Sequence, residues 1–255
     1  HKEKFYIPRI IGACKEPVVI EMEWAFGDTF KTWITSKPSM LDRLLYFRNL
    51  LEGVLFVHER GVIHRDLKPE NLIFGENHKV TIVDWTLAKK ANDDKRNLTV
   101  KGTMLGSPAY ASPQQLQDAK DATYQDDIFY LGFTLAAFIL GSRMPTPINT
   151  KDSLYKRKAK FRKLILDMKL DFRQFFHQTF AKATEIYPEE RYLDVGEFVE
   201  DIDDLIYQLQ HTKEGQELCQ LPDTKYPQMT FDPRDERNIP TIITPKVETA
   251  PIPPI

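Results

Sequence analysis

The chain has 255 residues, enough for one large domain or two small ones with a substantial core. Hydrophobic residues make up 42% of it and charged residues 28%, and the formal net charge of −2 excludes a global basic field that would attract nucleic acid or acidic lipid. The two cysteines, Cys14 and Cys219, do not suit a disulfide framework or a four-ligand zinc site. We therefore expect a reducing, cytoplasmic setting, and the longest apolar run, residues 131–141, is too short to span a bilayer.

Short β-branched runs and a helical period divide the first third of the chain. Residues 6–24 contain two such runs around a charged and Pro-containing turn, which predicts a strand hairpin. Apolar residues then recur at three- and four-residue steps from Ser39, where Ser39 and Asp42 resemble a capping box, and the helix should end near Gly61. A second hairpin is predicted for residues 72–83, around the turn-rich sequence GENH.

The remainder of the chain is predicted to be mainly helical. Residues 85–114 are polar and aperiodic, a long connection of the kind that usually carries function in a compact domain. Apolar residues occupy every face of 127–140, the pattern of a buried helix. We expect further helices over 152–168, 171–184 and 194–210. The Pro-rich segment after Pro222 predicts an extended arm.

The stretch VIHRDLKPENLIF, residues 62–74, concentrates charged groups between apolar ends. Asp66, Lys68 and Asn71, with Asp84 at the end of the next predicted strand, supply a base, a cation and two oxygen ligands. Phosphoryl transfer needs this set, because its catalysis depends on positioning and on neutralising charge around a magnesium ion. The alternative, surface charges at a strand turn, does not explain their joint spacing.

These residues also carry a family resemblance. The sequence HRDLKPEN resembles the catalytic loop of eukaryotic-type protein kinases and matches its H-R-D-L-x-x-x-N signature at every specified position. GSPAYASPQQL at 106–116 is similar to the close of that family's activation loop, and DIFYLG at 127–132 resembles the start of its central helix. PEERY at 188–192 resembles its late Arg-bearing turn. The matches occur in the family's order and cover roughly residues 1–210.

The resemblance implies an α+β protein kinase-like fold with a mainly helical large lobe. Residues 1–24 would be a remnant of the small lobe, its fourth and fifth strands, leading into the hinge. Residues 25–212 would form the large lobe, and residues 213–255 a Pro-rich extended tail.

The same resemblance implies a serine/threonine protein kinase that uses ATP and Mg²⁺ and acts on protein substrates. Asp66 would accept or orient the proton of the substrate hydroxyl, Lys68 would steady the transferring phosphate, and Asn71 and Asp84 would hold magnesium. Lys68 itself points to serine or threonine substrates. The residues implied for the nucleotide are Met22 as gatekeeper, the backbones of Glu23 and Ala25 against adenine, Asp28 near the ribose, and Ile73.

Regulatory roles follow from the resemblance as well. Arg65 would receive an activation-loop phosphate, since a guanidinium matches phosphate oxygens in a bidentate way. Thr99 and Thr103 would be phosphosites, with ordinary loop residues as the equal alternative. Ser107 stands where the family has a hydroxyl that touches the catalytic Asp and Lys. Asp127 would tie down the backbone of the catalytic loop.

The chain departs from the family at three motif positions. Trp85 and Thr86 replace the Phe and Gly that follow the metal-binding Asp, so we expect Trp85 to pack beside His64 and Ile10 and the loop to have a narrower conformational range. The third departure is Gln114, in place of a Glu that pairs with the late Arg. Gln114 should keep a hydrogen bond to Arg191 and lose the ion pair.

The larger departure is that no residues correspond to the glycine-rich loop, the phosphate-binding Lys or its Glu partner of the small lobe. We interpret the chain as part of a longer kinase; a small lobe supplied by another chain and an inactive scaffold are the alternatives. A pseudokinase module and an aminoglycoside-type phosphotransferase are the rival functions. The basic run at 156–163 predicts a solvated helix face, and because the overall charge is near neutral we expect no nucleic-acid partner. No membrane partner is expected for residues 1–255 either.

Overall fold

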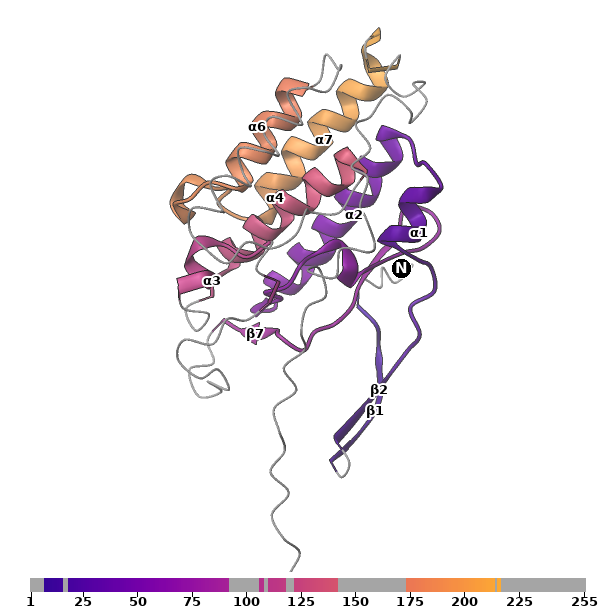
Figure 1. Cartoon of the computed structure of the whole chain (residues 1–255), viewed down its shortest axis with the longest axis vertical. Helices are drawn as coiled ribbons and strands as arrows, with labels where there is room; N and C mark the ends of the chain where they lie inside the picture. Colours follow the sequence, from indigo (N-terminus) through magenta and orange to yellow (C-terminus); the bar gives the residue numbers. More distant parts are fainter. Residues whose placement is uncertain are drawn as a thin grey trace, which may run out of the picture.

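The computed structural model describes residues 7–15, 18–91, 106–107, 110–117, 122–141, 173–213 and 215–216. Its main body consists of long helices packed side by side, with short strands at one end (Figure 1). The helices are α1 Phe30–Thr35, α2 Met40–His58, α3 Pro113–Gln117, α4 Tyr124–Leu140, α6 Arg173–Ala183 and α7 Val195–His211, with 3₁₀ turns η1 Pro69–Asn71 and η3 Pro188–Glu190. This mixture confirms the predicted α+β class.

Helix α2 follows the sequence pattern closely. Its capping box is formed as predicted, because the amide of Asp42 donates to Ser39 Oγ at 3.1 Å and the amide of Ser39 donates to Asp42 Oδ2 at 3.2 Å. The helix ends at His58, and the chain leaves it through Gly61 in the left-handed region, with φ of 74°. The helix therefore begins where the sequence predicts and ends one turn before Gly61.

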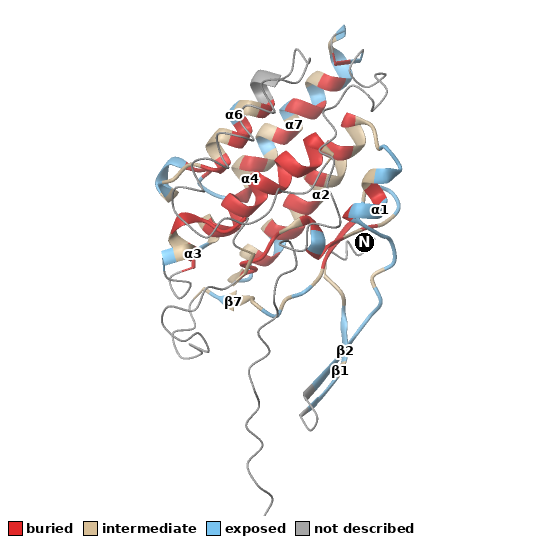
Figure 2. Cartoon of the chain, viewed as in Figure 1, coloured by how far each residue is buried: buried red, intermediate tan, exposed pale blue. Residues whose placement is uncertain are grey.

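Helix α4 is the buried centre of the body, and Figure 2 shows it buried along almost its whole length. The guanidinium of Arg43, a fully buried side chain on α2, donates to the carbonyls of Phe138 and Ile139 at 3.4 and 3.0 Å. These carbonyls belong to the last turn of α4, where the helix dipole favours a cation. Arg43 therefore joins two helices and satisfies groups that the helix leaves without an internal partner.

The strands place the polar cluster. Strands β5 Leu72–Phe74 and β6 Val80–Ile82 form the predicted antiparallel hairpin, and the short strand β3 Asp28–Thr29 pairs with the outer side of β5. Strand β4 Val62–Ile63 pairs with β7 Lys89–Lys90. The loop 64–71 consequently runs between β4 and β5, and Asp84 follows the end of β6.

An aromatic cluster fixes this sheet to the helices. The rings of Trp33 on α1 and Phe74 on β5 stack with centroids 4.3 Å apart, and Phe138 of α4 lies within 5.6 Å of Phe30, Trp33 and Phe74. Stacked and tilted aromatic pairs add to the stabilisation from buried area alone. The cluster thus holds α1 and β5 against α4.

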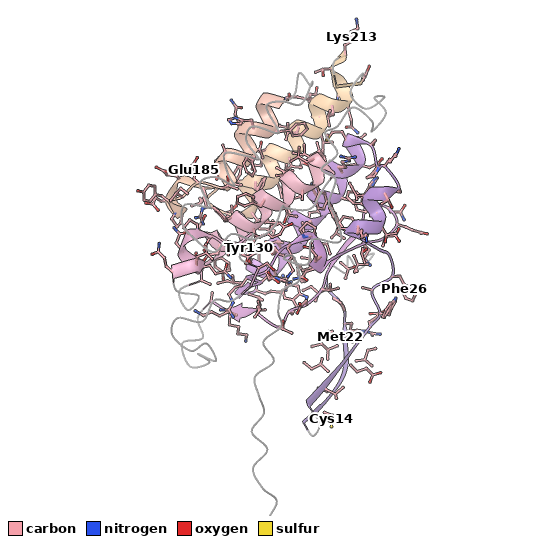
Figure 3. The ribbon with its side chains drawn as sticks, viewed as in Figure 1. Cys14, Met22, Phe26, Tyr130, Glu185 and Lys213 are labelled. Atoms are coloured by element: carbon pink, nitrogen blue, oxygen red, sulfur yellow. The ribbon has the colours of Figure 1, made fainter. Side chains whose placement is uncertain are left out.

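Strands β1 Ile10–Lys15 and β2 Val18–Met22 form the predicted first hairpin, which projects away from the helical body (Figure 1). Apolar side chains on it are exposed, among them Ile10, Ile20 and Met22, and Figure 3 shows Met22 on this projecting part. Two strands with uncovered apolar residues are marginal in water. The division into small-lobe remnant, large lobe and tail stays a prediction.

Some predictions lie outside the described residues, namely the helix over 152–168, the extended arm after Pro222, and any structure around Thr99 and Thr103. The helices predicted over 171–184 and 194–210 correspond to α6 and α7. In the described part of the chain, none of the helices combines the length and the apolar character that crossing a membrane requires.

The close approach of α4 to the end of α6 generates a stability prediction. A Cβ atom on Gly132 would lie 2.6 Å from Thr184 Cγ2 and 2.8 Å from Ala183 Cβ. Gly132→Ala should therefore lower the free energy of unfolding by about 1–3 kcal/mol through overpacking. Urea unfolding measures the change, with Gly12→Ala as control, because the nearest atom there is a flexible Glu21 oxygen at 3.4 Å. Equal stability of both variants would contradict the close packing.

Candidate active site

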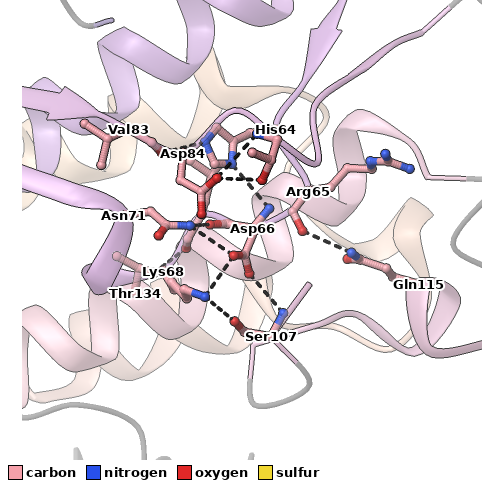
Figure 4. Close-up of polar contacts among 12 residues, drawn as sticks. His64, Arg65, Asp66, Lys68, Asn71, Val83, Asp84, Ser107, Gln115 and Thr134 are labelled. Carbon is pink, nitrogen blue, oxygen red and sulfur yellow. Dashed lines mark hydrogen bonds and ion pairs between the residues drawn. The ribbon is translucent and has the colours of Figure 1, made fainter. Parts of the chain in front are cut away.

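The loop 64–71, Asp84 and residues 106–107 meet in one polar cluster (Figure 4). Asp127 of α4 holds the backbone of this loop by hydrogen bonds. Its carboxylate is fully buried; Oδ2 accepts from the amide of His64 and Oδ1 from the amide of Arg65, each at 2.8 Å. His58 Nε2 lies 2.8 Å from Oδ2 as well. This is the backbone tie that the sequence predicted for Asp127.

Burial and hydrogen bonding act in opposite directions on the pKa of Asp127. Burial raises it, because removal from water disfavours the ionised carboxylate. The hydrogen bond and charge of His58, together with His64, act the other way and leave the pKa below its ordinary value. Asp127 is therefore a buried carboxylate that stays ionised at neutral pH.

The backbone of Arg65 is held in a sparsely populated conformation. Its φ is 70°, in the left-handed region that non-glycine residues rarely adopt. The amide donates to Asp127, and the carbonyl accepts from Gln115 Nε2 at 3.0 Å. On the other side of Asp66, Thr134 Oγ1 of α4 donates to the carbonyl of Leu67 at 2.8 Å. These contacts fix the loop on both sides of Asp66.

Asp66 is almost fully buried, with 4% of its surface exposed, and donors surround its carboxylate. Oδ2 lies 2.9 Å from Lys68 Nζ and accepts from Asn71 Nδ2 at 3.0 Å, while Oδ1 accepts from the amide of Ser107 at 2.9 Å. Lys68 Nζ also donates to Ser107 Oγ at 2.6 Å. The Ser107 hydroxyl thus contacts Lys68, whereas its backbone amide contacts Asp66. The sequence predicted contact of the hydroxyl with both.

His64 connects this loop to the strand that carries Asp84. Its Nδ1 accepts from the amide of Asp66 at 3.3 Å, and its Nε2 lies 3.3 Å from the carbonyl of Val83. Burial lowers the pKa of His64, so the ring is neutral and carries its proton on Nε2. The ring of Trp85 packs edge-on against it at 4.5 Å, as predicted, whereas Ile10 is exposed on the projecting hairpin.

Asp84 follows β6 in the left-handed region, with φ of 60°, and its side chain is exposed. The amide of Val83 donates to the carbonyl of Asn71 at 2.9 Å, which brings the start of the Asp84 loop next to Asn71. In Figure 4 the Asp84 carboxylate is directed toward the side of the cluster that holds Asn71 and Asp66. The two oxygen ligands predicted from the sequence therefore lie on neighbouring backbone segments.

The residues present fit a magnesium ion better than a metal that needs an all-protein cage. Asn71 turns its amide nitrogen toward Asp66, with bonds to the Asp66 carbonyl and carboxylate, so its oxygen faces away from Asp66. No group of three or more His, Cys, Asp or Glu side chains gathers as a metal site among the residues that the structure describes. One carboxylate and one amide oxygen suit Mg²⁺, which keeps waters and phosphate oxygens as its other ligands.

The residues predicted to bind the nucleotide fall into two groups. Asp28 pairs with Phe74 and Thr29 with Ile73 across the β3–β5 ladder, so Asp28 and Ile73 lie on adjacent strands. Met22 is the last residue of β2 and Glu23 follows it, at the open end of the hairpin opposite its turn. The amide of Glu23 donates to the carbonyl of Arg9 at 2.8 Å. Ala25 lies between the two groups, in the connection from β2 to β3.

The side chain of Arg65 contacts a segment other than that of Asp66, since its Nε donates to the carbonyl of Leu87. The side chain is largely buried, and burial lowers the pKa of its guanidinium without removing the charge. Arg65 thereby contacts the segment that leads into residues 92–105. Its predicted phosphate partners, Thr99 and Thr103, lie outside the described residues.

The predicted contact between Gln114 and Arg191 is present. Arg191 Nη2 donates to Gln114 Oε1 at 2.7 Å, and Gln114 Nε2 donates to the carbonyl of Ile186 at 2.8 Å. Arg191 also donates to the carbonyls of Gln125 and Glu185. Burial lowers the pKa of Arg191 to about 10. The neutral amide therefore serves as donor and acceptor at once, which a carboxylate could not do.

Three supporting residues of the site were not predicted from the sequence: His58, Gln115 and Thr134. Gln115 lies beside Gln114 in a segment with a family resemblance, yet nothing in the local sequence marks its reach to Arg65. Thr134 is the one hydroxyl side chain in the apolar run 131–141, and this signal could have singled it out. His58 closes α2, and only the packing of α2 against α4 reveals its partner.

Residues 5–217 match the family model for the protein kinase domain. The chain belongs to the protein kinase family. It is 27% identical over 197 residues to a probable serine/threonine-protein kinase PknB of Lactococcus lactis, covering 75% of this chain and 30% of that protein. It is 27% identical over 226 residues to the serine/threonine-protein kinase PknD of Chlamydia caviae, covering 74% and 23%. CBL-interacting protein kinase 26 of Oryza sativa is 32% identical over 151 residues, covering 59% and 30%.

The chain spans less than a third of the length of these relatives. The family match confirms the resemblance inferred from HRDLKPEN and its companion motifs. Protein kinases as a family use ATP and Mg²⁺ to transfer a phosphoryl group.

The Asp127 tie predicts a pH-dependent loss of stability. Asp127→Asn would turn an amide group toward donors that need an acceptor, so the free energy of unfolding at pH 7 should fall by about 3 kcal/mol. Because the folded pKa of Asp127 lies below its ordinary 3.8, the carboxylate stabilises the fold above that value, and this contribution disappears as the pH falls through the folded pKa.

Urea unfolding of both proteins between pH 7 and pH 3 measures the effect. The difference between them should be constant near neutral pH and should narrow in acid. Asp204→Asn, an exposed substitution on α7, is the matched control. A difference that does not change with pH would contradict the assigned pKa.

Proposed function

We propose that this chain carries the large lobe of a serine/threonine protein kinase, which transfers the γ-phosphoryl group of ATP to protein hydroxyls with the help of Mg²⁺. The observation that supports it most directly is the arrangement around Asp66. The Lys68 ammonium and the Asn71 amide both lie within hydrogen-bond distance of the buried Asp66 carboxylate, and a second carboxylate follows on a neighbouring segment. This is the donor and acceptor set that phosphoryl transfer uses.

In the proposed reaction, Asp66 accepts or orients the proton of the attacking hydroxyl. Its ion pair with Lys68 holds the ammonium beside the carboxylate, where the incoming phosphoryl group would lie. Lys68 then neutralises charge on the transferring phosphoryl oxygens, while its bond to Ser107 Oγ limits its freedom of movement. A positioned base contributes about 10²- to 10⁴-fold to such a step.

Asn71 and Asp84 are the proposed ligands of Mg²⁺, which when bound would neutralise charge on the phosphates of the nucleotide. Asn71 connects the two halves of the site, because its Nδ2 contacts Asp66 and its carbonyl accepts from the amide of Val83. The position of the cation is thereby related to that of the base. Asp28 and Ile73 on the β3–β5 pair, with Met22, Glu23 and Ala25 of the hinge, are the proposed contacts for ribose and adenine.

Arg65 is proposed to receive a phosphate on the segment 92–105, with Thr99 or Thr103 as the modified residue. The support is its position, since its guanidinium contacts the carbonyl of Leu87 where the chain leaves for that segment. The exposed apolar residues of the β1–β2 hairpin support the further proposal that another small-lobe element, from the same chain or a second one, covers it in the working kinase.

Activity measurements on the full gene product that contains this chain test the proposal. Asp66→Asn should lower the rate of phosphate transfer from ATP to a serine-containing protein substrate by at least about 100-fold, because the amide cannot accept the proton. Asp84→Ala should abolish the Mg²⁺-dependent activity. Asp204→Asn on the exposed face of α7 should leave the rate unchanged. Near-normal activity of either site variant would contradict the assigned roles.

Nucleotide binding separates this function from a pseudokinase scaffold. A kinase should bind a fluorescent ATP analogue more tightly when Mg²⁺ is added, whereas a scaffold without a working site should show no dependence on Mg²⁺. Transfer to an aminoglycoside but not to protein would favour the small-molecule phosphotransferase instead.

A further inference from the structure

Thr86, two residues after the proposed metal ligand Asp84, makes a contact that a glycine at this position cannot make. Its Oγ1 donates to Asp84 Oδ1 at 2.6 Å, and its amide lies 3.4 Å from the same oxygen. Within the described part of the chain, Thr86 supplies both hydrogen bonds that this carboxylate accepts. The side chain of Asp84 is otherwise exposed, so packing does not set its rotamer.

The backbone explains why a threonine is accommodated here. The residue with positive φ in this turn is Asp84, at 60°, and Thr86 is not among the described residues with positive φ. Thr86 therefore needs no glycine-like freedom, contrary to what the loss of a glycine suggested from the sequence. The substitution leaves the backbone of residue 86 unstrained and adds a hydroxyl beside the carboxylate.

The contacts of Trp85 fix the backbone turn that carries Thr86. The indole Nε1 donates to the carbonyl of Ile82 at 2.9 Å, and the ring packs against the buried His64. The carbonyl of Trp85 accepts from the amide of Ala88 at 3.1 Å, which closes the turn. A hydroxyl on a mobile loop would orient little, whereas this one is carried by a turn tied to β6 and to the catalytic loop.

We propose that Thr86 is a positioning residue for magnesium in this kinase, holding Asp84 Oδ1 so that Oδ2 is presented to the cation. The inference rests on the proposed function, because it assumes that Asp84 binds the metal. A carboxylate has several acceptor sites, so one hydrogen bond to Oδ1 still leaves an oxygen for Mg²⁺. Magnesium tolerates little departure from octahedral geometry, and partners of a ligating carboxylate typically affect metal affinity about 10- to 100-fold.

Two substitutions on the full gene product separate the hydroxyl from the rest of the side chain. Thr86→Val keeps the size and β-branching and removes the hydroxyl, and Thr86→Ser keeps the hydroxyl. The readout is the Mg²⁺ concentration that half-saturates binding of a fluorescent ATP analogue, which does not depend on turnover. We expect Thr86→Val to raise this concentration about tenfold, and Thr86→Ser to stay close to the unchanged protein.

The exposed position of Thr86 allows both variants to fold, and equal thermal unfolding midpoints in the absence of Mg²⁺ verify this. An unchanged half-saturating concentration in Thr86→Val would overturn the proposal while leaving the kinase function intact, as would an equal loss in Val and Ser variants. Absence of Mg²⁺-dependent nucleotide binding in the unchanged protein would overturn the proposed function and, with it, the role of Thr86. The two failures are therefore distinguishable.

Discussion

The buried carboxylate of Asp127 is the contact on which the site depends. A charge without access to water is tolerated only when donors surround it, and here two consecutive backbone amides and His58 do so. This arrangement holds the loop 64–71 with Arg65 in the left-handed region, a backbone conformation that non-glycine residues rarely adopt. The strained backbone of Arg65 is compensated by these hydrogen bonds. If the loop relaxed, the buried carboxylate of Asp127 would lose two of its donors.

Further hydrogen bonds extend this fixed geometry from α4 to the side chains of the polar cluster. Asp66 is positioned by backbone contacts on either side of it in the loop. Its Oδ2 contacts Lys68 and Asn71 and its Oδ1 accepts from the backbone amide of Ser107, so its two oxygens are not interchangeable. Asn71 and Val83 pass this order on to the loop of Asp84 through one backbone hydrogen bond. The proposed base and the proposed metal ligands are consequently parts of one connected network, in which a change at any member is expected to alter the others.

The sequence was sufficient for features whose cause is local. The capping box of Ser39, the all-round apolar pattern of α4 and the spacing of Asp66, Asn71 and Asp84 each reflect a rule that operates within a few residues or within a known motif. The sequence did not predict three contacts: that of Gln115 with Arg65, that of the Ser107 amide, rather than its hydroxyl, with Asp66, and that of Thr86 with Asp84. They depend on where one segment lies against another or on the rotamer of a single side chain, which composition and periodicity do not encode.

The joint between Gln114 and Arg191 has a consequence for the conditions under which the fold holds. A carboxylate at position 114 would lose its ion pair with the guanidinium once it was protonated, and salt would screen the attraction between the two charges. An amide has no proton to gain in that range and presents only a dipole. This corner of the molecule should therefore keep its direct contact unchanged in mild acid and in concentrated salt.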